Sequence, residues 1–381
     1  MTHDADEYNK IDIRLEDDEG EHLKRFFEKG LNALLVDPYF LLLYVPENGG
    51  KMQIIRPVND SYHRKRMIKR INEAKRIPSF YYALSHVWGL TEDNRYYWND
   101  ISDYVDDENG QPVEPVSMRD EKRDTLLTML RDHPGSYWWI DVLCARTDTP
   151  LDIMGDIYAC CLECIVMFDC EPSLIPEILK AKAQANAPQL LELLDTFLEC
   201  GWWQRVWTWQ EMTLPLGEVR FLSESDTHGL QSNTITLNEL LSVCEMDSTF
   251  WEEYEQDGIY IAVFELGLYT VSDAKESNAS RIHSFDPDTI ERILWSLVYS
   301  LRQCYDPCDY VYGVLGILQI KIPRMEDPDE VWRHFLLGLD DLWPLDCGRW
   351  IDRENEINLR QVEGIGEVYL KLMNIYYGRC E

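Results

Sequence analysis

The sequence predicts an α/β protein whose mostly parallel sheet is doubly wound, flavodoxin-like and flanked by helices. Four short apolar runs, typical of buried strands, alternate with segments in which apolar residues recur at helical spacing. Strands separated by helices favour parallel pairing with right-handed crossovers, because parallel neighbours need a long connection. The expected strands are Phe80–Ser85, Tyr137–Val142, Ile165–Phe168 and Val219–Leu222.

This α/β pattern occupies the middle of the chain, over residues 78–229. Residues 1–77 form an N-terminal extension. Within it, Leu31–Val45 is apolar and bounded by prolines, so we expect one or two short buried strands there. A basic helix is expected over His63–Arg76. Residues 230–381 are mainly helical in pattern, and we expect this region to pack on the core.

Helices next to the expected strands are recognised by their start signals and apolar stripes. Ser117 is expected to cap a helix whose first turn carries acidic residues and whose buried stripe includes Leu126 and Leu130. Pro150 suits the first position of the next helix. Further helices are expected over Pro188–Cys200, Trp203–Met212 and Thr289–Gln303.

The charge balance narrows the range of partners. The chain has 36 Lys and Arg against 69 Asp and Glu, a net charge of −33. A surface this acidic repels nucleic acid and anionic membranes, so neither is an expected partner. The basic helix over His63–Arg76 is the local exception. We expect it to be a solvated helix that pairs with the acidic remainder, and anion binding is the alternative.

The cysteines and the chain's hydropathy indicate a reducing compartment. The first twenty residues are acidic and lack the apolar core of a signal peptide, and no apolar run is long enough to cross a membrane. A cytoplasmic protein with free thiols is therefore expected. Cys160, Cys161, Cys164 and Cys170 lack a second ligand pair at the usual zinc spacing, so we expect buried small hydrophobes and no metal site.

Polar residues follow three of the expected strands and predict a cleft. Ser85, Asp141 and Asp169 all come at strand carboxyl ends, which share one edge of a parallel sheet. The helix carrying Glu211 is expected to begin near that edge. A carboxylate beside indole faces suits a nucleotide that carries a pyridinium ring. The alternatives stay open: the tryptophans as core, Asp141 as a cap, and Glu211 as a partner of Arg205.

Five segments in the same order resemble the fungal heterokaryon incompatibility (HET) domain family. Tyr82–Gly89 is similar to the family's A-L-S-Y-x-W-G motif, Trp139–Cys144 to W-I-D-A-x-C-I-N-Q, and Met154–Ala159 to M-x-x-I-Y-x-x-A. Trp202–Glu211 resembles W-x-R-V-W-T-x-Q-E, and Arg302–Gly316 resembles the R-x-x-x-x-P-x-D-x-V-Y-G-L-L-G segment. Together these motifs cover roughly residues 80–318.

The chain also departs from that pattern at several positions. His86 replaces the usual aromatic residue, and Ala145 and Arg146 stand where Asn-Gln is expected. Met167-Phe168-Asp169 replaces the W-L-G that usually follows the third strand. The tail of the second motif is therefore the part that the resemblance supports least.

HET domains are distant relatives of Toll/interleukin-1 receptor (TIR) domains, some of which cleave NAD⁺. The resemblance therefore implies a TIR-like fold and an allorecognition or programmed-cell-death protein that acts in innate immunity. The TIR catalytic glutamate lies in a W-x-x-x-E segment, which corresponds here to Trp207–Glu211. By this analogy Glu211 is the catalytic residue of an NAD⁺ glycohydrolase, with NAD⁺ as substrate and no cofactor.

The resemblance also implies a substrate-binding set. Trp88 or Trp207 would stack on a ring, Ser85 would bond the ribose or a phosphate, and Arg205 would hold a phosphate or orient Glu211. The substrate-binding residues inferred in this way are Ser85, His86, Trp88, Gly89, Asp141, Arg205 and Trp207. The alternative hypothesis is a non-catalytic module that self-associates or binds a partner signalling protein. A hydrolase or transferase acting on another nucleotide is the third.

Overall fold

The computed structural model describes residues 10–14, 20–88, 96–226, 233–244, 287–345 and 348–378. These residues divide into two compact units. Unit 1 comprises Met1–Thr149, Asp156–Glu177 and Pro215–Leu237, and unit 2 comprises Pro150–Gly155, Ile178–Leu214 and Asn238–Glu381, within which the same gaps apply. Unit 1 contains the sheet, and unit 2 is helical.

The sheet of unit 1 has eight strands in the order β10-β9-β8-β3-β7-β1-β2-β5, and its centre is parallel. The central neighbours β9, β8, β3 and β7 pair in parallel, whereas β1 joins β7 and β10 joins β9 antiparallel. The strands are β1 (Leu42–Tyr44), β2 (Met52–Ile55), β3 (Tyr81–His86), β5 (Val105–Asp106), β7 (Tyr137–Ile140), β8 (Glu163–Phe168), β9 (Glu218–Ser223) and β10 (Ile235–Thr236). The α/β class and the mostly parallel sheet are thus confirmed.

The four expected strands correspond to β3, β7, β8 and β9. Their residues are almost entirely buried, because helices or other chain segments cover both sides of the central strands. In the sheet the four lie side by side in the order β7-β3-β8-β9. The first of them in the chain, β3, therefore lies between the second, β7, and the third, β8. The chain therefore reverses its winding direction at β3, as it does in doubly wound sheets.

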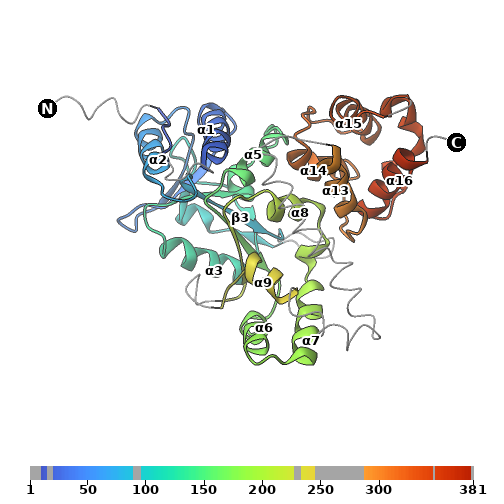
Figure 1. Cartoon of the computed structure of the whole chain (residues 1–381). Helices are drawn as coiled ribbons and strands as arrows, with labels where there is room; N and C mark the ends of the chain where they lie inside the picture. The colour runs from blue at the N-terminus through green and yellow to red at the C-terminus, as the bar shows by residue number, and fades with distance from the viewer. Residues whose placement is uncertain are drawn as a thin grey trace. The chain divides into compact units, whose positions relative to one another are not determined.

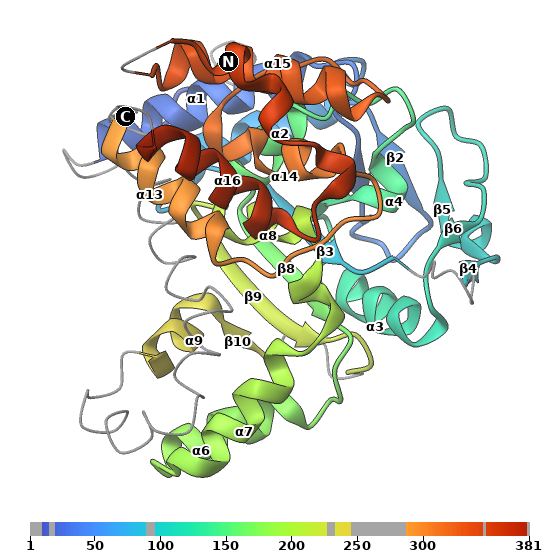
Figure 2. The ribbon, with the colours of Figure 1, turned by 90° about the vertical axis from the view of Figure 1, so that its right-hand side faces the viewer.

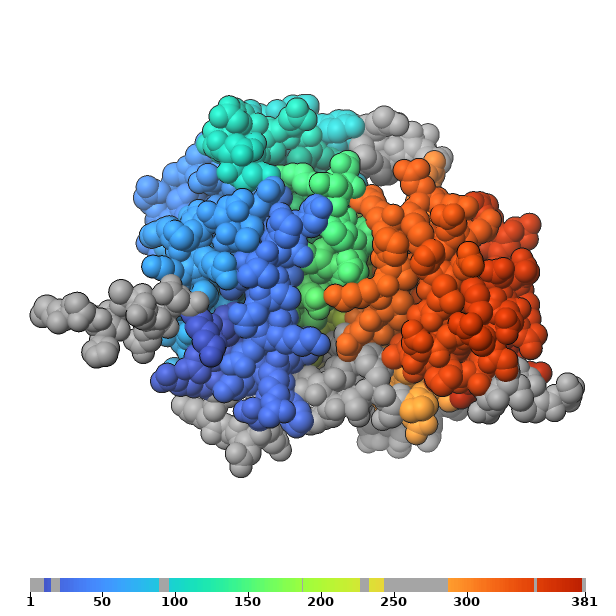
Figure 3. All heavy atoms as spheres, turned by 90° about the horizontal axis from the view of Figure 1, so that it is seen from above, coloured from blue at the N-terminus to red at the C-terminus, as the bar shows by residue number. Residues whose placement is uncertain are grey.

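Helices cover the sheet of unit 1. Figure 1 draws α1 and α2 together above the strands and α3 below them. In Figure 3 the described N-terminal residues, coloured in shades of blue, lie together on the face of unit 1 that is seen from above. The helices are α1 (Gly20–Val36), α2 (Ser61–Glu73), α3 (Asp120–Arg131) and α4 (Asp141–Cys144), while α5 (Ile153–Ala159) and α6 (Leu174–Ala183) span the division between the units.

The N-terminal region differs in part from the sequence-based expectation. The basic helix is present as α2, capped by Asp60, whose side chain accepts from the His63 amide. Leu31–Val45 is not two strands, because α1 continues to Val36 and only β1 follows. The apolar residues of α1 recur at helical rather than alternating spacing and bury one face: Phe27, Leu31, Leu34 and Leu35.

Two expected helix starts are also wrong. Ser117 lies in β6 (Val116–Ser117), which pairs with β4 (Tyr97–Trp98), so it does not cap a helix. The helix begins three residues later, at Asp120, and its expected stripe is buried. Pro150 precedes α5 by a turn rather than opening it. Tertiary pairing outweighed the local capping preference at Ser117.

Unit 2 is built from helices. Its members are α7 (Ala187–Leu198), η2 (Gly201–Gln204), α8 (Val206–Thr213), α9 (Leu237–Cys244, which starts in unit 1), α13 (Pro287–Val298), α14 (Asp309–Leu318), α15 (Pro328–Leu342), η5 (Trp350–Glu356), η6 (Leu359–Gln361) and α16 (Ile365–Tyr377). The helix α14 packs on α8, and α13 packs on α16. The described residues beyond 236 confirm the mainly helical C-terminal pattern.

Three expected helices of unit 2 are present with shifted ends. The segment Pro188–Cys200 corresponds to α7, and Thr289–Gln303 corresponds to α13, which ends earlier at Val298. Trp203–Met212 is split: a short 3-10 helix precedes α8, with Arg205 between them in extended conformation. The packing of residues 230–381 on the core stays a prediction.

Candidate functional site

The carboxyl ends of four parallel strands gather polar side chains at one edge of the unit 1 sheet. Ser85 and His86 end β3, Asp141 follows β7, and Asp169 follows β8. Glu224 directly follows β9 at the same edge. Parallel pairing of all four strands therefore places the residues that sequence analysis selected, and one that it missed, along one line.

Asp141 organises the first part of this edge. Its Oδ1 lies 3.0 Å from His86 Nε2, and its Oδ2 accepts a hydrogen bond of 2.6 Å from the indole Nε1 of Trp88. The same Oδ1 accepts from the amide of Val142 at 2.7 Å, so Asp141 also caps the turn that follows β7. Both alternatives that the sequence left open for Asp141, a cap and a site residue, are compatible with this geometry.

The exposure of these side chains differs sharply. Ser85 and His86 are buried at 1% and 3% exposure, so the rigid end of β3 fixes them. Trp88 is 41% exposed and presents indole surface while its nitrogen is held by Asp141. An anchored and half-exposed indole is a suitable platform for a flat ring. Gly89 lies outside the described residues.

A buried ion-pair network forms the second part of the edge. Lys122 of α3 has a fully buried side chain; its Nζ lies 2.9 Å from Glu224 Oε2 and donates to the carbonyl oxygen of Val87. Arg119 pairs with the other carboxylate oxygen of Glu224. Burial lowers the pKa of Lys122, and the nearby Glu224 charge opposes that shift. The network ties α3 to the ends of β3 and β9.

The position of this edge in the sheet favours ligand binding. The winding direction reverses at β3, which lies between β7 and β8. Figure 2 shows β3, β8 and β9 side by side. In open parallel sheets ligands bind outside the carboxyl ends of strands at such a reversal, because the loops diverge and leave a crevice. The chain leaves the sheet at this point, directly after His86.

Glu211 lies in unit 2, on α8, with 7% of its surface exposed. The fully buried guanidinium of Arg302 is its electrostatic partner, and burial lowers the pKa of Arg302 to about 9 against the opposing charge of Glu211. Arg302 Nη1 donates to the carbonyl oxygen of Arg205 at 3.0 Å and to the Thr208 hydroxyl. Its guanidinium carbon lies 5.6 Å from the ring centroids of both Trp202 and Trp203.

Arg205 lies just before the helix that carries Glu211. It precedes α8 in extended conformation, so it is not on the same helix face as Glu211. Trp207 and Glu211 are one turn apart on α8, as the W-x-x-x-E spacing predicts. Trp207 hydrogen-bonds Asp309, and burial raises the pKa of the Asp309 carboxyl to about 6, although that hydrogen bond and Arg205 oppose the shift.

Glycines allow α14 to approach α8 closely and so fix the position of Glu211. A Cβ atom on Gly313 would lie 2.4 Å from Val206 Cγ1, and one on Gly316 would lie 2.7 Å from Gln210 Oε1. Both neighbours belong to α8. Gly313 and Gly316, which belong to the Arg302–Gly316 motif, therefore form the face of α14 that contacts α8. The helix α8 in turn belongs to the Trp202–Glu211 motif.

The described cysteines of the segment 160–170 lie in and around α5 and β8. No group of three or more His, Cys, Asp or Glu in the described part of the chain could hold a metal ion. Cys160, Cys161 and Cys164 are buried in unit 1. Cys160 Sγ would lie only 2.4 Å from a Cβ on Gly30, so this thiol fills space against α1 as a small hydrophobe.

Sequence reasoning missed Lys122, Glu224 and Asp309 as members of these clusters. The strand-end rule that selected Asp141 applies equally to Glu224, which follows the fourth expected strand. Lys122 gave no signal, because it lies in a polar helical turn that is typical of a solvated face. Arg302 and Asp309 belong to the fifth motif, but their roles depend on α8, which is distant in sequence.

Comparison of this chain with protein-family models, with curated proteins and with solved structures found no match. Among the described helices, none has the length and apolar character needed to cross a membrane. The expectation that the unit 1 residues and those around Glu211 line one cleft stays a prediction.

Proposed function

We propose that this protein is a HET-type, TIR-like effector of allorecognition or programmed cell death that hydrolyses NAD⁺ at the nicotinamide–ribose bond. The observation that carries the proposal is Glu211: a buried carboxylate on α8, one turn after Trp207 and paired electrostatically with Arg302. The strand order β7-β3-β8-β9, which is the second-first-third-fourth order of flavodoxin-like sheets, supports the fold on which this function rests.

In the proposed reaction the main requirement is a negative charge beside the ribose, and a group that transfers protons is less important. The bond between ribose C1′ and the nicotinamide nitrogen breaks, its electron pair leaves with nicotinamide, and water supplies the new hydroxyl of ADP-ribose. Positive charge grows on the ribose as the bond stretches, and the Glu211 carboxylate stabilises it while binding the ribose hydroxyls. Arg302, whose pKa of about 9 keeps it cationic at neutral pH, favours the ionised form of Glu211.

The edge of the unit 1 sheet supplies features suited to nucleotide binding. The indole of Trp88, anchored by Asp141, offers a face to a ring. His86 is positioned by the same carboxylate. In this proposal Ser85, Trp207 and Arg205 keep the substrate-binding roles that the family resemblance implies, with NAD⁺ as substrate rather than as a resident cofactor.

The decisive experiment measures nicotinamide release from NAD⁺ by the purified full-length protein. Glu211→Gln preserves size and hydrogen-bonding capacity, and we expect it to lower the rate about 100-fold or more because it removes the stabilising charge. Glu199→Gln, which changes an exposed acid after α7, is the matched control and should keep the wild-type rate. No nicotinamide from the concentrated or cross-linked wild-type protein, or equal rates for both variants, would refute the proposal.

A non-catalytic association module is the second candidate, and one observation favours it. Three large hydrophobic side chains are exposed around the α13–α14 connection: Tyr299, Leu301 and Tyr305, at 54%, 63% and 93%. Large apolar side chains that are exposed close together in the sequence favour a contact surface. If the wild type lacks NAD⁺ cleavage but shows a mass by light scattering that rises with concentration and falls in Leu301→Ser/Tyr305→Ser, this candidate gains support. Tyr62→Ser, on α2, is the control.

A further inference from the structure

A pocket opens at the amino edge of the unit 1 sheet, at the other end of the strands from His86 and Asp141. Its lining includes Ser79 and Phe80 before β3, Ser136 before β7 and Leu162 before β8, and its volume is about 670 Å³. This volume lies within the range of small-molecule sites. The pocket takes no part in the proposed NAD⁺ chemistry, and the inference drawn from it is independent of that proposal.

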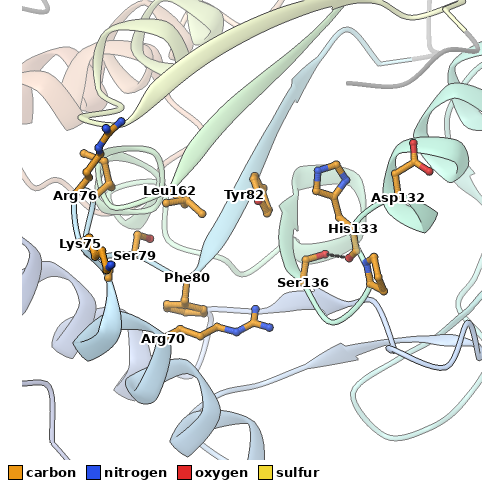
Figure 4. A pocket seen from close by; sticks show the side chains of 13 residues that line it. Arg70, Lys75, Arg76, Ser79, Phe80, Tyr82, Asp132, His133, Ser136 and Leu162 are labelled. Atoms are coloured by element: carbon orange, nitrogen blue, oxygen red, sulfur yellow. Dashed lines mark hydrogen bonds between the residues drawn. The ribbon is translucent and has the colours of Figure 1, made fainter. Parts of the chain in front are cut away.

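The lining is cationic in a protein whose net charge is −33. Arg70, Lys75 and Arg76, at the end of α2 and just after it, contribute three positive charges, and Asp132 is the one acid that lines the pocket. Figure 4 shows these side chains around the hollow together with His133. So strong a local reversal of charge attracts an anion.

Two of these cations, Lys75 and Arg76, have no interaction partner among the described residues. Lys75 and Arg76 are exposed and make neither an ion pair nor a hydrogen bond with any part of the chain that the structure describes. Arg70 is partly committed, since its Nη2 donates to the Gly135 carbonyl oxygen at 2.9 Å and its guanidinium lies 5.3 Å from the Tyr137 ring. That bond fixes Arg70 and leaves its remaining N–H donors available.

The simplest competing explanation is the dipole of α2. Cations near a helix C-terminus compensate the carbonyl charge there, and this accounts for Arg70 in the last turn. It does not account for the other side of the pocket, which α2 does not supply. His133 and Ser136 come from the connection between α3 and β7 and line the same pocket as Lys75 and Arg76.

The aromatic rings of Tyr82 and His133 form one wall of the pocket, and Trp138 packs against both. The Tyr82 ring stacks on Trp138 at 4.6 Å, and His133 lies edge-on to both. The His133 Nδ1 lies 2.8 Å from the Met129 carbonyl oxygen, which can only accept, so the proton of the neutral ring is on Nδ1. Its Nε2 then remains for a ligand, as an acceptor when neutral and as a donor when protonated.

We propose that this pocket binds a small phosphate-bearing molecule. The three cations and the carboxylate of Asp132 leave two net positive charges, which match a dianionic phosphate group. Arginine side chains present paired N–H donors that fit phosphate oxygens, and lysine adds a compact charge. The ligand is a small molecule rather than a nucleic acid, because a net charge of −33 repels an extended polyanion, whereas the cationic lining spans a pocket of about 670 Å³.

The test is calorimetric titration of the full-length protein at low ionic strength with inorganic pyrophosphate and, separately, with ADP. We expect saturable binding of both, weakened about tenfold or more in Lys75→Ala/Arg76→Ala, because each lost cation removes a charge-assisted contact. Both residues are exposed, so the variant should fold normally. Tighter binding of ADP than of pyrophosphate identifies a nucleoside contact, and equal binding identifies phosphate alone as the recognised group.

The matched control removes the same charge from the preceding helix, α2, at positions that do not line the pocket. Lys65→Ala/Lys69→Ala changes two exposed lysines of α2 and should leave both affinities within about twofold. Absence of saturable binding by the wild type would overturn the proposal. An equal loss of affinity in the two double variants would also overturn it, because binding would then reflect general attraction to the basic segment and not recognition in the pocket.

Discussion

Asp141 illustrates how much a single carboxylate can organise at the end of a strand. It holds the Trp88 indole, positions the His86 ring and caps its own turn with its two oxygens. Glu224 has a comparable place at the end of β9, where it meets Lys122 and Arg119. At the residue scale the candidate edge is therefore built from two carboxylates, each fixed by donors from other elements.

Asp309 provides a pH-dependent test at the same scale. Burial raises its pKa in the folded protein to about 6, above the ordinary value of 3.8. The folded state therefore binds this proton more tightly than the unfolded chain does. It follows that the Asp309 contribution to stability falls as pH rises from about 4 to about 6 and stays low above that range.

Asp309→Asn removes this titration and keeps an acceptor for Trp207. We expect the unfolding free energy of the variant, relative to wild type, to be higher at pH 7 than at pH 4 by about 1–3 kcal/mol. Urea titrations at the two pH values measure the difference. Asp288→Asn, at an exposed acid in the first turn of α13, is the control. A relative stability that does not change with pH would contradict the assignment.

Among the contacts between elements, the packing of α14 on α8 matters most for the candidate site, because α8 carries Glu211. Val206 and Gln210 of α8 meet the glycine face of α14, and Gly155 approaches the same face. Arg302 then joins the start of α8 to the segment that precedes α14. Two motifs that are separate in sequence thus form one packed unit around Glu211.

Gly316→Ala tests this helix contact. The added Cβ would lie 2.7 Å from both Gln210 Oε1 and the Gly155 Cα, and the backbone atom cannot turn away as a side chain can. We expect a loss of about 1–3 kcal/mol in unfolding free energy, because overpacking outweighs the better helix propensity of alanine. Gly50→Ala, whose added Cβ would meet the end of the exposed Asn48 side chain, should lose less. A Gly316→Ala variant as stable as wild type in urea would show that the contact is loose.

At the scale of the whole molecule, charge is the dominant property. A net charge of −33 with 69 acidic residues makes self-repulsion a cost of every compact state. Part of it is relieved locally, for example by Arg220, which pairs with Glu163 and Glu218 across β8 and β9. The basic pocket at the amino edge is the clearest reversal of sign in the described part of the chain.

Salt should therefore stabilise the protein. We expect the urea midpoint to rise between about 10 mM and about 300 mM NaCl, because the screening length falls and repulsion among exposed acids weakens. Urea is the right denaturant, since guanidinium is itself a salt. A midpoint that stays constant or falls over this range would indicate that exposed ion pairs, rather than repulsion, dominate the electrostatics.

The local sequence pattern correctly predicted the central strands and most helices. It failed where contacts with distant parts of the chain determined the secondary structure. Continuous apolar runs predicted β3, β7, β8 and β9, since strands covered on both faces need them. Ser117 carries a helix-cap signal but pairs with Tyr97 in a small sheet, and Leu31 belongs to a helix whose period the apolar run concealed. In both cases a partner elsewhere in the chain outweighed the local preference.

The sequence by itself determined the α/β class, the strands whose ends carry Ser85 and Asp141, and the helical spacing of Trp207 and Glu211. Each of these depends on residues close together in the chain. Only the tertiary structure decided that Lys122 meets Glu224, that Arg302 lies close enough to Glu211 for their charges to interact, and that a basic pocket lies at the opposite strand ends. The physical reason is that these contacts join segments far apart in sequence, and burial then sets their charge and strength.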